Sequence, residues 1–252
     1  MKISVLTPSF NSAETLERAI KSVLIQRYSN WEHIIIDGGS CDETIQILEQ
    51  YPHIIWKSEK DNGQSDAMNK AFDLCTGDII VYLNADDEFN EGVFEKVISE
   101  FERMDGMPRR MVITDIEILN DINQSYVATP SLFIEDILNP AKLKYPYNPI
   151  SYFYEKNLQA EIGKFPSNFH YAMDYWYLLR LYTKAKISYL EISAGKFHNY
   201  DNKTSNVVLS EVEVLYILKQ FIREKHPLTF FTKKNWIKAF GKGIRLQKKI
   251  SL

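Results

Sequence analysis

Residues 77–88 read Gly-Asp-Ile-Ile-Val-Tyr-Leu-Asn-Ala-Asp-Asp-Glu, an apolar run followed directly by acidic residues. Ile79 to Leu83 is a short apolar run with β-branched residues, which predicts a strand buried on both faces. The run ends in Asn84-Ala85-Asp86-Asp87. Two adjacent carboxylates at the end of a buried strand repel each other and lose hydration, so a bound cation would stabilise them. For an isolated Asp-Asp pair, a solvated turn that caps the next helix is the simpler explanation.

The segments before this stretch alternate between strand and helix patterns. Apolar strands are predicted at residues 3–7, 34–36, 54–56 and 79–83, with segments of helical spacing between them. This alternation predicts an α/β fold with a doubly wound, mostly parallel central sheet and helices on both faces.

The remainder of the chain continues with mixed elements. The expected elements, in order, are a helix at 93–104, a strand at 111–118, loops and short elements at 119–150 and a strand at 150–154. A helix beginning near Asp174, a strand at 187–192, a loop carrying His198 and a long helix at 207–225 follow. We expect a domain over 1–205, with halves 1–105 and 106–205, and a helical, basic C-terminal extension over 206–252.

Polar side chains follow three of the predicted strands at one edge of the sheet: Thr7, Asp37 and the pair Asp86-Asp87. Ligands of open α/β sheets bind at the carboxyl ends of strands, so these positions predict a ligand crevice. Carboxylate oxygens suit Mg²⁺ or Mn²⁺, which often bridge a protein carboxylate and a diphosphate. The chain has no Gly-x-Gly-x-x-Gly after a strand and no P-loop motif. The sequence therefore lacks the motifs typical of dinucleotide-dependent dehydrogenases and of P-loop NTPases.

Four N-terminal segments together resemble glycosyltransferase family 2, whose members have the GT-A fold and use nucleotide-activated sugars. They are Thr7-Pro8-Ser9-Phe10-Asn11, Ile36-Asp37-Gly38-Gly39-Ser40, Asp61 to Lys70 (Asp-Asn-Gly-Gln-Ser-Asp-Ala-Met-Asn-Lys) and Asn84-Ala85-Asp86-Asp87. A looser match continues through Ala172-Met173-Asp174-Tyr175 and through His198 ahead of Lys203-Thr204. Each motif alone is weak, and the signal lies in their order and spacing over residues 1 to about 205.

The resemblance implies roles for individual residues. Those expected at the nucleotide sugar are Thr7, Ser9, Asp37 (at the uracil N3–H), Asp61, Asp66, Asn69, Asn84 and Asp86 (at a ribose or sugar hydroxyl). Asp87 and His198 are the expected metal ligands, and Asp174 is the expected general base. On their chemistry alone, His198 could equally be a solvated or structural histidine, and Asp174 an ordinary residue of a helix N-terminus.

The function implied by the resemblance is that of an inverting glycosyltransferase dependent on Mn²⁺ or Mg²⁺. The donor would be a nucleotide-sugar, with UDP favoured, and the acceptor a saccharide, such as a lipid-linked precursor of a bacterial surface polysaccharide (O-antigen or capsule). One alternative is a nucleotidyltransferase, which would need a Gly-rich N-terminal loop with a basic residue; Pro8-Ser9-Phe10-Asn11 has neither. The other is a non-catalytic binding module, which we would expect to have lost Asp87 or Asp174.

Charge is unevenly distributed along the chain. The net charge is −3, which argues against nucleic-acid binding, yet the segment from Lys225 onward contains basic residues and no acidic ones. Residues 230–240 interleave aromatics with lysines, which favours either an interfacial helix on anionic lipid or a solvated tail packed on the domain. The N-terminus resembles a strand and not a signal peptide, and Cys41 and Cys75 lack metal-ligand spacing. These features predict a cytoplasmic protein, and the interfacial-helix alternative would add peripheral contact with the inner face of the membrane through residues 230–252.

Overall fold

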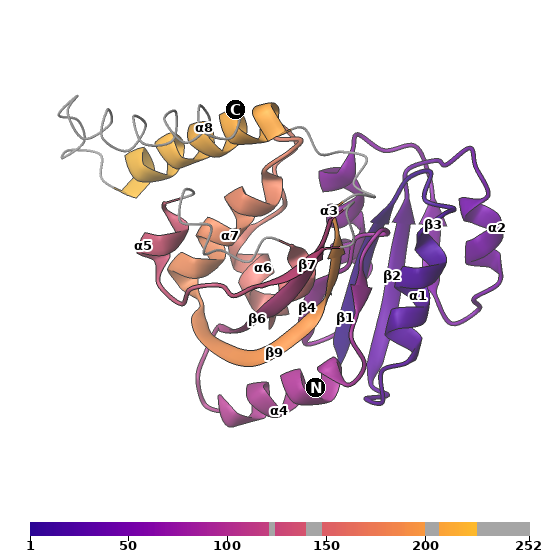
Figure 1. The fold of residues 1–252 in the computed structure, drawn as a ribbon, viewed down its shortest axis with the longest axis horizontal. Coiled ribbons are helices and arrows are strands. Elements are labelled where there is room, and N and C mark those ends of the chain that lie inside the picture. The colour runs from indigo at the N-terminus through magenta and orange to yellow at the C-terminus, as the bar shows by residue number, and fades with distance from the viewer. Residues whose placement is uncertain (121–123, 140–147, 200–206, 226–252) are drawn as a thin grey trace.

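The computed structural model describes residues 1–120, 124–139, 148–199 and 207–225 (Figure 1). Its centre is a nine-stranded sheet in which the path β3-β2-β1-β4-β8-β6-β9-β5 is hydrogen-bonded and β7 pairs with β6. The first four strands are β1 (Ile3–Ser9), β2 (Trp31–Asp37), β3 (Ile55–Ser58) and β4 (Ile79–Tyr82), and all of their pairings are parallel. The predicted N-terminal strands are therefore confirmed.

The second half of the sheet is mixed in direction. Its strands are β5 (Glu88–Phe89), β6 (Arg110–Leu119), β7 (Ser125–Ala128), β8 (Tyr152–Glu155) and β9 (Lys186–His198). β8 lies antiparallel to both β4 and β6, and β9 lies parallel to β6. The antiparallel pairings β5–β9 and β6–β7 complete the set, so β1, β2, β3, β4, β6 and β9 share one direction and the sheet is mostly parallel, as expected.

Helices cover both faces of the sheet, as the alternation predicted. Ile79 and Val81 of β4 face one cluster, which includes residues of α1 (Leu16–Leu24) and α4 (Val93–Arg103). α2 (Thr44–Glu49) packs beside α1 on the same face. Ile80 and Tyr82 face the other cluster, which includes residues of α3 (Gln64–Leu74), α6 (Lys156–Ile162) and α7 (Met173–Lys184).

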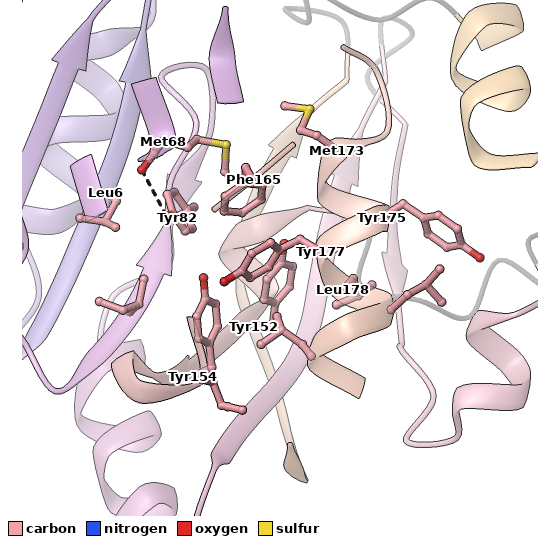
Figure 2. Packing of buried hydrophobic residues seen from close by; sticks show 14 of the residues in the cluster. Leu6, Met68, Tyr82, Tyr152, Tyr154, Phe165, Met173, Tyr175, Tyr177 and Leu178 are labelled. Carbon is pink, nitrogen blue, oxygen red and sulfur yellow. Dashed lines mark hydrogen bonds between the residues drawn. The ribbon is translucent and has the colours of Figure 1, made fainter. Parts of the chain in front are cut away.

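An aromatic core joins α7 to the sheet (Figure 2). The rings of Phe165 and Tyr177 stack with their centroids 4.1 Å apart, and Tyr82 meets Phe165 edge-on at 5.2 Å. The buried side chain of Gln159 accepts a hydrogen bond of 2.7 Å from the Tyr154 hydroxyl, so the polar end of that ring is satisfied. This packing holds the body of α7, and with it the helix start that carries Asp174, against the sheet.

The short elements expected within 119–150 are present, whereas the last strand differs from the sequence-based expectation. Within residues 119–150, β7 forms a hairpin with β6, and α5 (Ile134–Ile137) forms a short helix. β9 is longer than the predicted strand at 187–192, and His198 is its last residue and not part of a loop, because the β6–β9 ladder extends to the pair Leu119–His198.

α8 (Val207–Lys225) lies beside α7 at the side of the molecule away from β3 (Figure 1). Ile217, Leu218 and Phe221 are buried in the same cluster as α7, so this helix belongs to the folded body. The expected boundary between 205 and 206, and the segment 230–252, lie outside the described residues. Over the part of the chain that the structure describes, no helix is both long and apolar enough to cross a bilayer.

Candidate active site

The ends of β1 and β2 meet where the sequence placed a ligand crevice. Ser9 pairs with Asp37 in the β1–β2 ladder, and the Gly38 N–H donates to the Ser9 carbonyl at 2.8 Å. The Ser9 side chain is 3% exposed, and its hydroxyl has no hydrogen-bond partner among the described residues. A buried hydroxyl without a partner is costly, so a ligand group that bonded to it would be stabilised.

Asp37 lies at this edge but is enclosed by its own loop. Its carboxylate accepts hydrogen bonds from the backbone N–H groups of Gly39 (3.0 Å) and Ser40 (2.9 Å) and from the Ser58 hydroxyl (2.6 Å). The Ser40 hydroxyl also donates to it, and the residue is fully buried. The expected contact of Asp37 with a nucleotide base stays a prediction, and it would require Ser40 or Ser58 to move.

Asp61 lies directly against this loop. A Cβ on Gly38 would lie 2.7 Å from Asp61 Oδ2, so only glycine fits there without displacing the carboxylate. Asp61 Oδ1 accepts a hydrogen bond of 2.9 Å from the Gly63 N–H, just before α3. Asp66, in the first turn of α3, accepts a hydrogen bond from the Asn62 N–H at 3.1 Å. The structure thus gathers Ser9, Asp37 and Asp61, with Asp66 nearby on α3.

Thr7 and Asn69 do not join this group. Thr7 is fully buried two residues before the end of β1, and its hydroxyl lies 2.9 Å from Nε2 of buried His33. The Asn69 side chain donates to the Phe165 carbonyl at 3.0 Å and accepts from the Phe165 N–H at 2.8 Å. Neither geometry matches the expected direct contact with substrate, because core packing and backbone pairing already occupy both side chains.

Asp87 is the centre of a second group, at the end of β4. It is fully buried, and its Oδ2 accepts hydrogen bonds from the side-chain amides of Asn148 (2.6 Å) and Asn84 (3.1 Å). Asn84 also accepts a hydrogen bond from Gln64 of α3 at 3.1 Å, which links this group to the start of that helix. Asn148 was not predicted from the sequence, since it lies in a polar stretch without a recognisable motif.

His198 reaches Asp87 through the backbone. Its N–H donates to Asp87 Oδ1 at 3.2 Å, and its ring Nε2 lies 3.3 Å from Glu88 Oε1. The side chain is buried, and Lys196 Nζ forms an ion pair of 3.1 Å with the same Glu88 oxygen. A Cβ on Gly195 would collide with the Glu88 carbonyl, so glycine allows the close β5–β9 pairing that brings His198 to Asp87.

The electrostatics of Asp87 are those of a buried acid near a second carboxylate. Burial and the neighbouring charge of Asp86 raise the pKa of Asp87 to about 8, against the lowering effect of the hydrogen bonds from Asn148, Asn84 and the His198 N–H. Asp86 itself is half-buried, and its carbonyl accepts a 2.6 Å hydrogen bond from Arg18 of α1. Within the described ranges, no three His, Cys, Asp or Glu side chains form a ready metal-binding group.

Asp174 lies in the first turn of α7. It is half-buried, and its Oδ1 accepts a hydrogen bond of 2.7 Å from the Tyr175 N–H. Burial raises the pKa of Asp174 to about 6, the nearby charge of Glu213 adds to this effect, and backbone hydrogen bonds oppose it. A carboxylate with a pKa near 6 can accept a proton at neutral pH more readily than an ordinary aspartate.

Comparison with known proteins identifies sequence relatives. A sequence profile described as Glycosyl transferase family 2 matches residues 4–159. The chain is 31% identical over 181 residues to the "Uncharacterized glycosyltransferase Rv1514c" of Mycobacterium tuberculosis (strain ATCC 25618 / H37Rv). The matched region covers 71% of this chain and 68% of that protein. It is 36% identical over 100 residues to the "Putative teichuronic acid biosynthesis glycosyltransferase TuaG" of Bacillus subtilis (strain 168), but this covers only 37% of this chain and 39% of TuaG.

Comparison with solved structures supports the fold. S. aureus TarS 1-349 in complex with UDP-GlcNAc superposes with a TM-score of 0.66 at 18% sequence identity, over 96% of this chain and 80% of that one. Likeness at this level of identity concerns the arrangement of helices and strands, and it confirms the expected GT-A-type architecture.

Proposed function

Because this chain belongs to glycosyltransferase family 2, and is therefore a glycosyltransferase that acts on nucleotide sugars, we propose that it is an inverting, divalent-metal-dependent enzyme that uses a UDP-sugar. The observation that carries the proposal is the environment of Asp87. This carboxylate is fully buried at the end of β4, and it is surrounded by two side-chain amides and one backbone N–H. These hydrogen bonds orient the carboxylate but do not neutralise its negative charge. A bound cation would neutralise it.

The residues around Asp87 fit a divalent cation. No Lys or Arg forms an ion pair with Asp87 in the described part of the chain, and its charge is further disfavoured by Asp86. Asp87 and the His198 imidazole would hold the cation, and diphosphate oxygens would complete its coordination. When bound, Mn²⁺ or Mg²⁺ would stabilise the negative charge that develops on the leaving diphosphate.

The donor nucleotide would lie along the strand ends. Ser9 and Asp61 flank the loop after β2, and the unpartnered Ser9 hydroxyl can bond to a ligand there. Asp37 would contact the base after an exchange of its Ser40 or Ser58 partner, and Asp66, Asn84 and Asp86 would line the ribose and sugar. The UDP-GlcNAc complex of TarS, a protein of similar fold, supports a uridine donor.

Asp174 would act as the general base of a single displacement. Its carboxylate would accept the proton of the acceptor hydroxyl as that oxygen attacks the anomeric carbon. The bond between that carbon and the diphosphate oxygen breaks at the same time, UDP leaves with the electron pair, and the configuration inverts. A carboxylate has the same role in activating water in inverting glycosidases.

The acceptor in our proposal is a saccharide on a lipid-linked precursor of a bacterial surface polysaccharide. The name of TuaG, a relative over the N-terminal part of the chain, supports a role in cell-wall polysaccharide synthesis. Peripheral membrane contact through residues 230–252 would bring the enzyme to such an acceptor, since that segment combines aromatics with lysines. Sedimentation with anionic vesicles tests this contact. The double variant Lys233→Glu, Lys234→Glu should bind the vesicles less than the wild-type protein does, and equal binding of the two proteins would contradict the proposed contact.

Calorimetric titration with UDP, with and without Mn²⁺ and with GDP as the competing nucleotide, tests the donor site. We expect UDP to bind the wild-type chain more tightly when Mn²⁺ is present, and we expect Asp87→Asn to lose this metal effect. Asp73→Asn is the matched control. The Asp73 carboxylate forms an ion pair with Lys164 on the surface, so this variant should bind UDP as wild type does. Absence of binding for both nucleotides under both conditions would contradict the proposed donor site.

A further inference from the structure

The helix that carries Asp174 begins without a cap of its own. Ala172 occupies the N-cap position of α7, and it offers no side-chain acceptor. The N-terminal turn of a helix leaves backbone N–H groups without intrahelical partners, and alanine is among the poorest residues at the N-cap. The backbone around the proposed base therefore depends on acceptors from elsewhere in the chain.

Glu213 of α8 provides an acceptor for the N–H of the N-cap residue Ala172 and for the two N–H groups before it. Its carboxylate accepts hydrogen bonds from the backbone N–H groups of His170 (3.0 Å), Tyr171 (2.8 Å) and Ala172 (2.9 Å). Hydrogen bonds to an ionised carboxylate are stronger than neutral ones, and a negative charge is favoured at the N-terminus of a helix. One side chain, 41 residues beyond Ala172, thus holds three consecutive amides before α7.

A second contact joins the same two segments. Phe169, immediately before these amides, is 5% exposed, and its ring centroid lies 6.1 Å from that of Tyr216 on α8. One turn of α8 therefore carries both a polar and an aromatic contact to the 169–172 segment. At the other end of the helix pair, Glu224 forms a 3.2 Å ion pair with Arg180 of α7.

We propose that Glu213 is a positioning residue for glycosyl transfer: by holding the 170–172 amides, it sets the orientation of the Asp174 carboxylate toward the acceptor. The inference rests on the proposed function, in which Asp174 is the base. Asp174 follows Ala172 by two residues, and its own carboxylate is oriented by the next N–H, that of Tyr175. Rotation of this turn would therefore move the base, and a displacement of about 1 Å in a reacting group can reduce a rate about 100-fold.

The charge of Glu213 also acts on Asp174. Among the described residues, the titratable side chains that interact electrostatically with Asp174 are Glu213 of α8 and Tyr152 of β8. The buried Tyr152 hydroxyl has no hydrogen-bond partner in the same part of the chain. Tyr152 stays neutral at physiological pH, because burial and the charge of Asp174 raise its pKa well above its ordinary value. Removal of the Glu213 charge should therefore lower the pKa of Asp174 and move the acid limb of the transfer profile to lower pH.

Three full-length variants separate these effects. Glu213→Ala removes all three acceptor contacts, and Glu213→Gln keeps one amide oxygen that can accept from Tyr171 and Ala172 but removes the charge. Glu224→Ala is the matched control, because it breaks a different α7–α8 contact and leaves the 170–172 amides unchanged. Each is compared with wild type for UDP binding, for kcat and donor KM of sugar transfer from a UDP-sugar, and for amide hydrogen exchange at 170–172.

For Glu213→Ala we expect kcat to fall about tenfold or more, with UDP affinity and donor KM changed by no more than about twofold and exchange at 170–172 faster. Glu213→Gln should show an intermediate loss and an acid limb at lower pH, and Glu224→Ala should match wild type. A Glu213→Ala chain with the kcat and exchange of the Glu224 control would overturn the proposal. If the wild-type chain itself transfers no sugar, the proposed function fails, whereas unchanged exchange at 170–172 in Glu213→Ala overturns the Glu213 assignment alone.

Discussion

The side-chain amide of Asn148 donates a hydrogen bond of 2.6 Å to the buried carboxylate of Asp87, 61 residues earlier in the chain. Asn148 is 2% exposed, and its Oδ1 accepts a hydrogen bond of 3.1 Å from the Ile150 N–H at the turn before β8. Its amide is therefore fixed at both ends, and this orients the carboxylate that we assign to the metal.

Asn148→Ala should weaken the binding of Mn²⁺ together with UDP about 10- to 100-fold, since loss of an orienting partner has effects of this size on metal affinity. Calorimetric titration of UDP at saturating Mn²⁺ measures the change. Asn199→Ala is the control: this residue follows His198, but its side chain pairs with Asn120 on the surface. Equal losses in both variants would contradict a specific role for Asn148.

Asp174→Asn should reduce sugar transfer about 10²- to 10⁴-fold while UDP binds as in wild type, because only proton acceptance is removed. In the wild-type chain, transfer should rise with pH through an apparent pKa of about 6, since the base acts in its ionised form above that pH. Steady-state rates from pH 4.5 to 8 and UDP calorimetry measure these effects. A fully active Asn variant, or a rate independent of pH across this range, would exclude Asp174 as the base.

Asn69→Ala should destabilise the fold and leave UDP affinity nearly unchanged. The substitution leaves the Phe165 N–H and carbonyl without their side-chain partner, which we expect to lower the free energy of unfolding by about 2 kcal/mol. Urea denaturation and UDP calorimetry on the same protein measure the two quantities. Loss of UDP affinity with unchanged stability would instead support the direct contact between Asn69 and substrate that the sequence predicts.

Glu32→Gln should lower stability at neutral pH but not in acid. Burial alone would raise the pKa of Glu32, but hydrogen bonds from Lys2, Ser4 and Thr76 outweigh this and lower the pKa from its ordinary 4.5 to about 2. The folded state thus gains stability from ionised Glu32 above about pH 4.5 and loses it as the pH falls to about 2. The difference corresponds to about 3 kcal/mol, and urea denaturation from pH 7 to pH 2 can measure its loss.

If Glu32→Gln and wild type differed equally at all pH values, the ionisation of Glu32 would not be the cause. Glu17→Gln is the control, because Glu17 forms an exposed ion pair with Lys21. Exposed pairs contribute little to stability, so this variant should unfold as wild type does.

The N-terminal half of the fold follows from local sequence patterns. The apolar run at 79–83 and two of its predecessors became β4, β1 and β2, because strands buried on both faces need continuous apolar sequence. The third predecessor became β3, an edge strand that is largely exposed. The order of polar residues after these strands also placed Asp37, Asp61 and Asp87 at one edge of the sheet, since parallel strands end on the same side. Family membership rests on the same segments.

Pairing between distant segments decided the rest. The β6–β9 ladder made His198 the buried end of a strand, and Gly195 allowed the close approach of β5 that this requires. The hydrogen bonds of Thr7 with His33, and of Asn69 with the Phe165 backbone, were likewise not predicted from the sequence. A local sequence pattern does not predict these hydrogen-bond and pairing partners, because each partner lies tens of residues away in the chain.

The family, the parallel half of the sheet and the residue types available for chemistry could be predicted from the amino-acid sequence, because they depend on apolar periodicity and on motif order. The pairing of Asn148 with Asp87, and of Glu213 with the backbone just before the helix of Asp174, became apparent from the three-dimensional fold. The physical reason is that a buried carboxylate or an uncapped helix must find partners, while the fold alone determines which distant side chain is close enough to supply them.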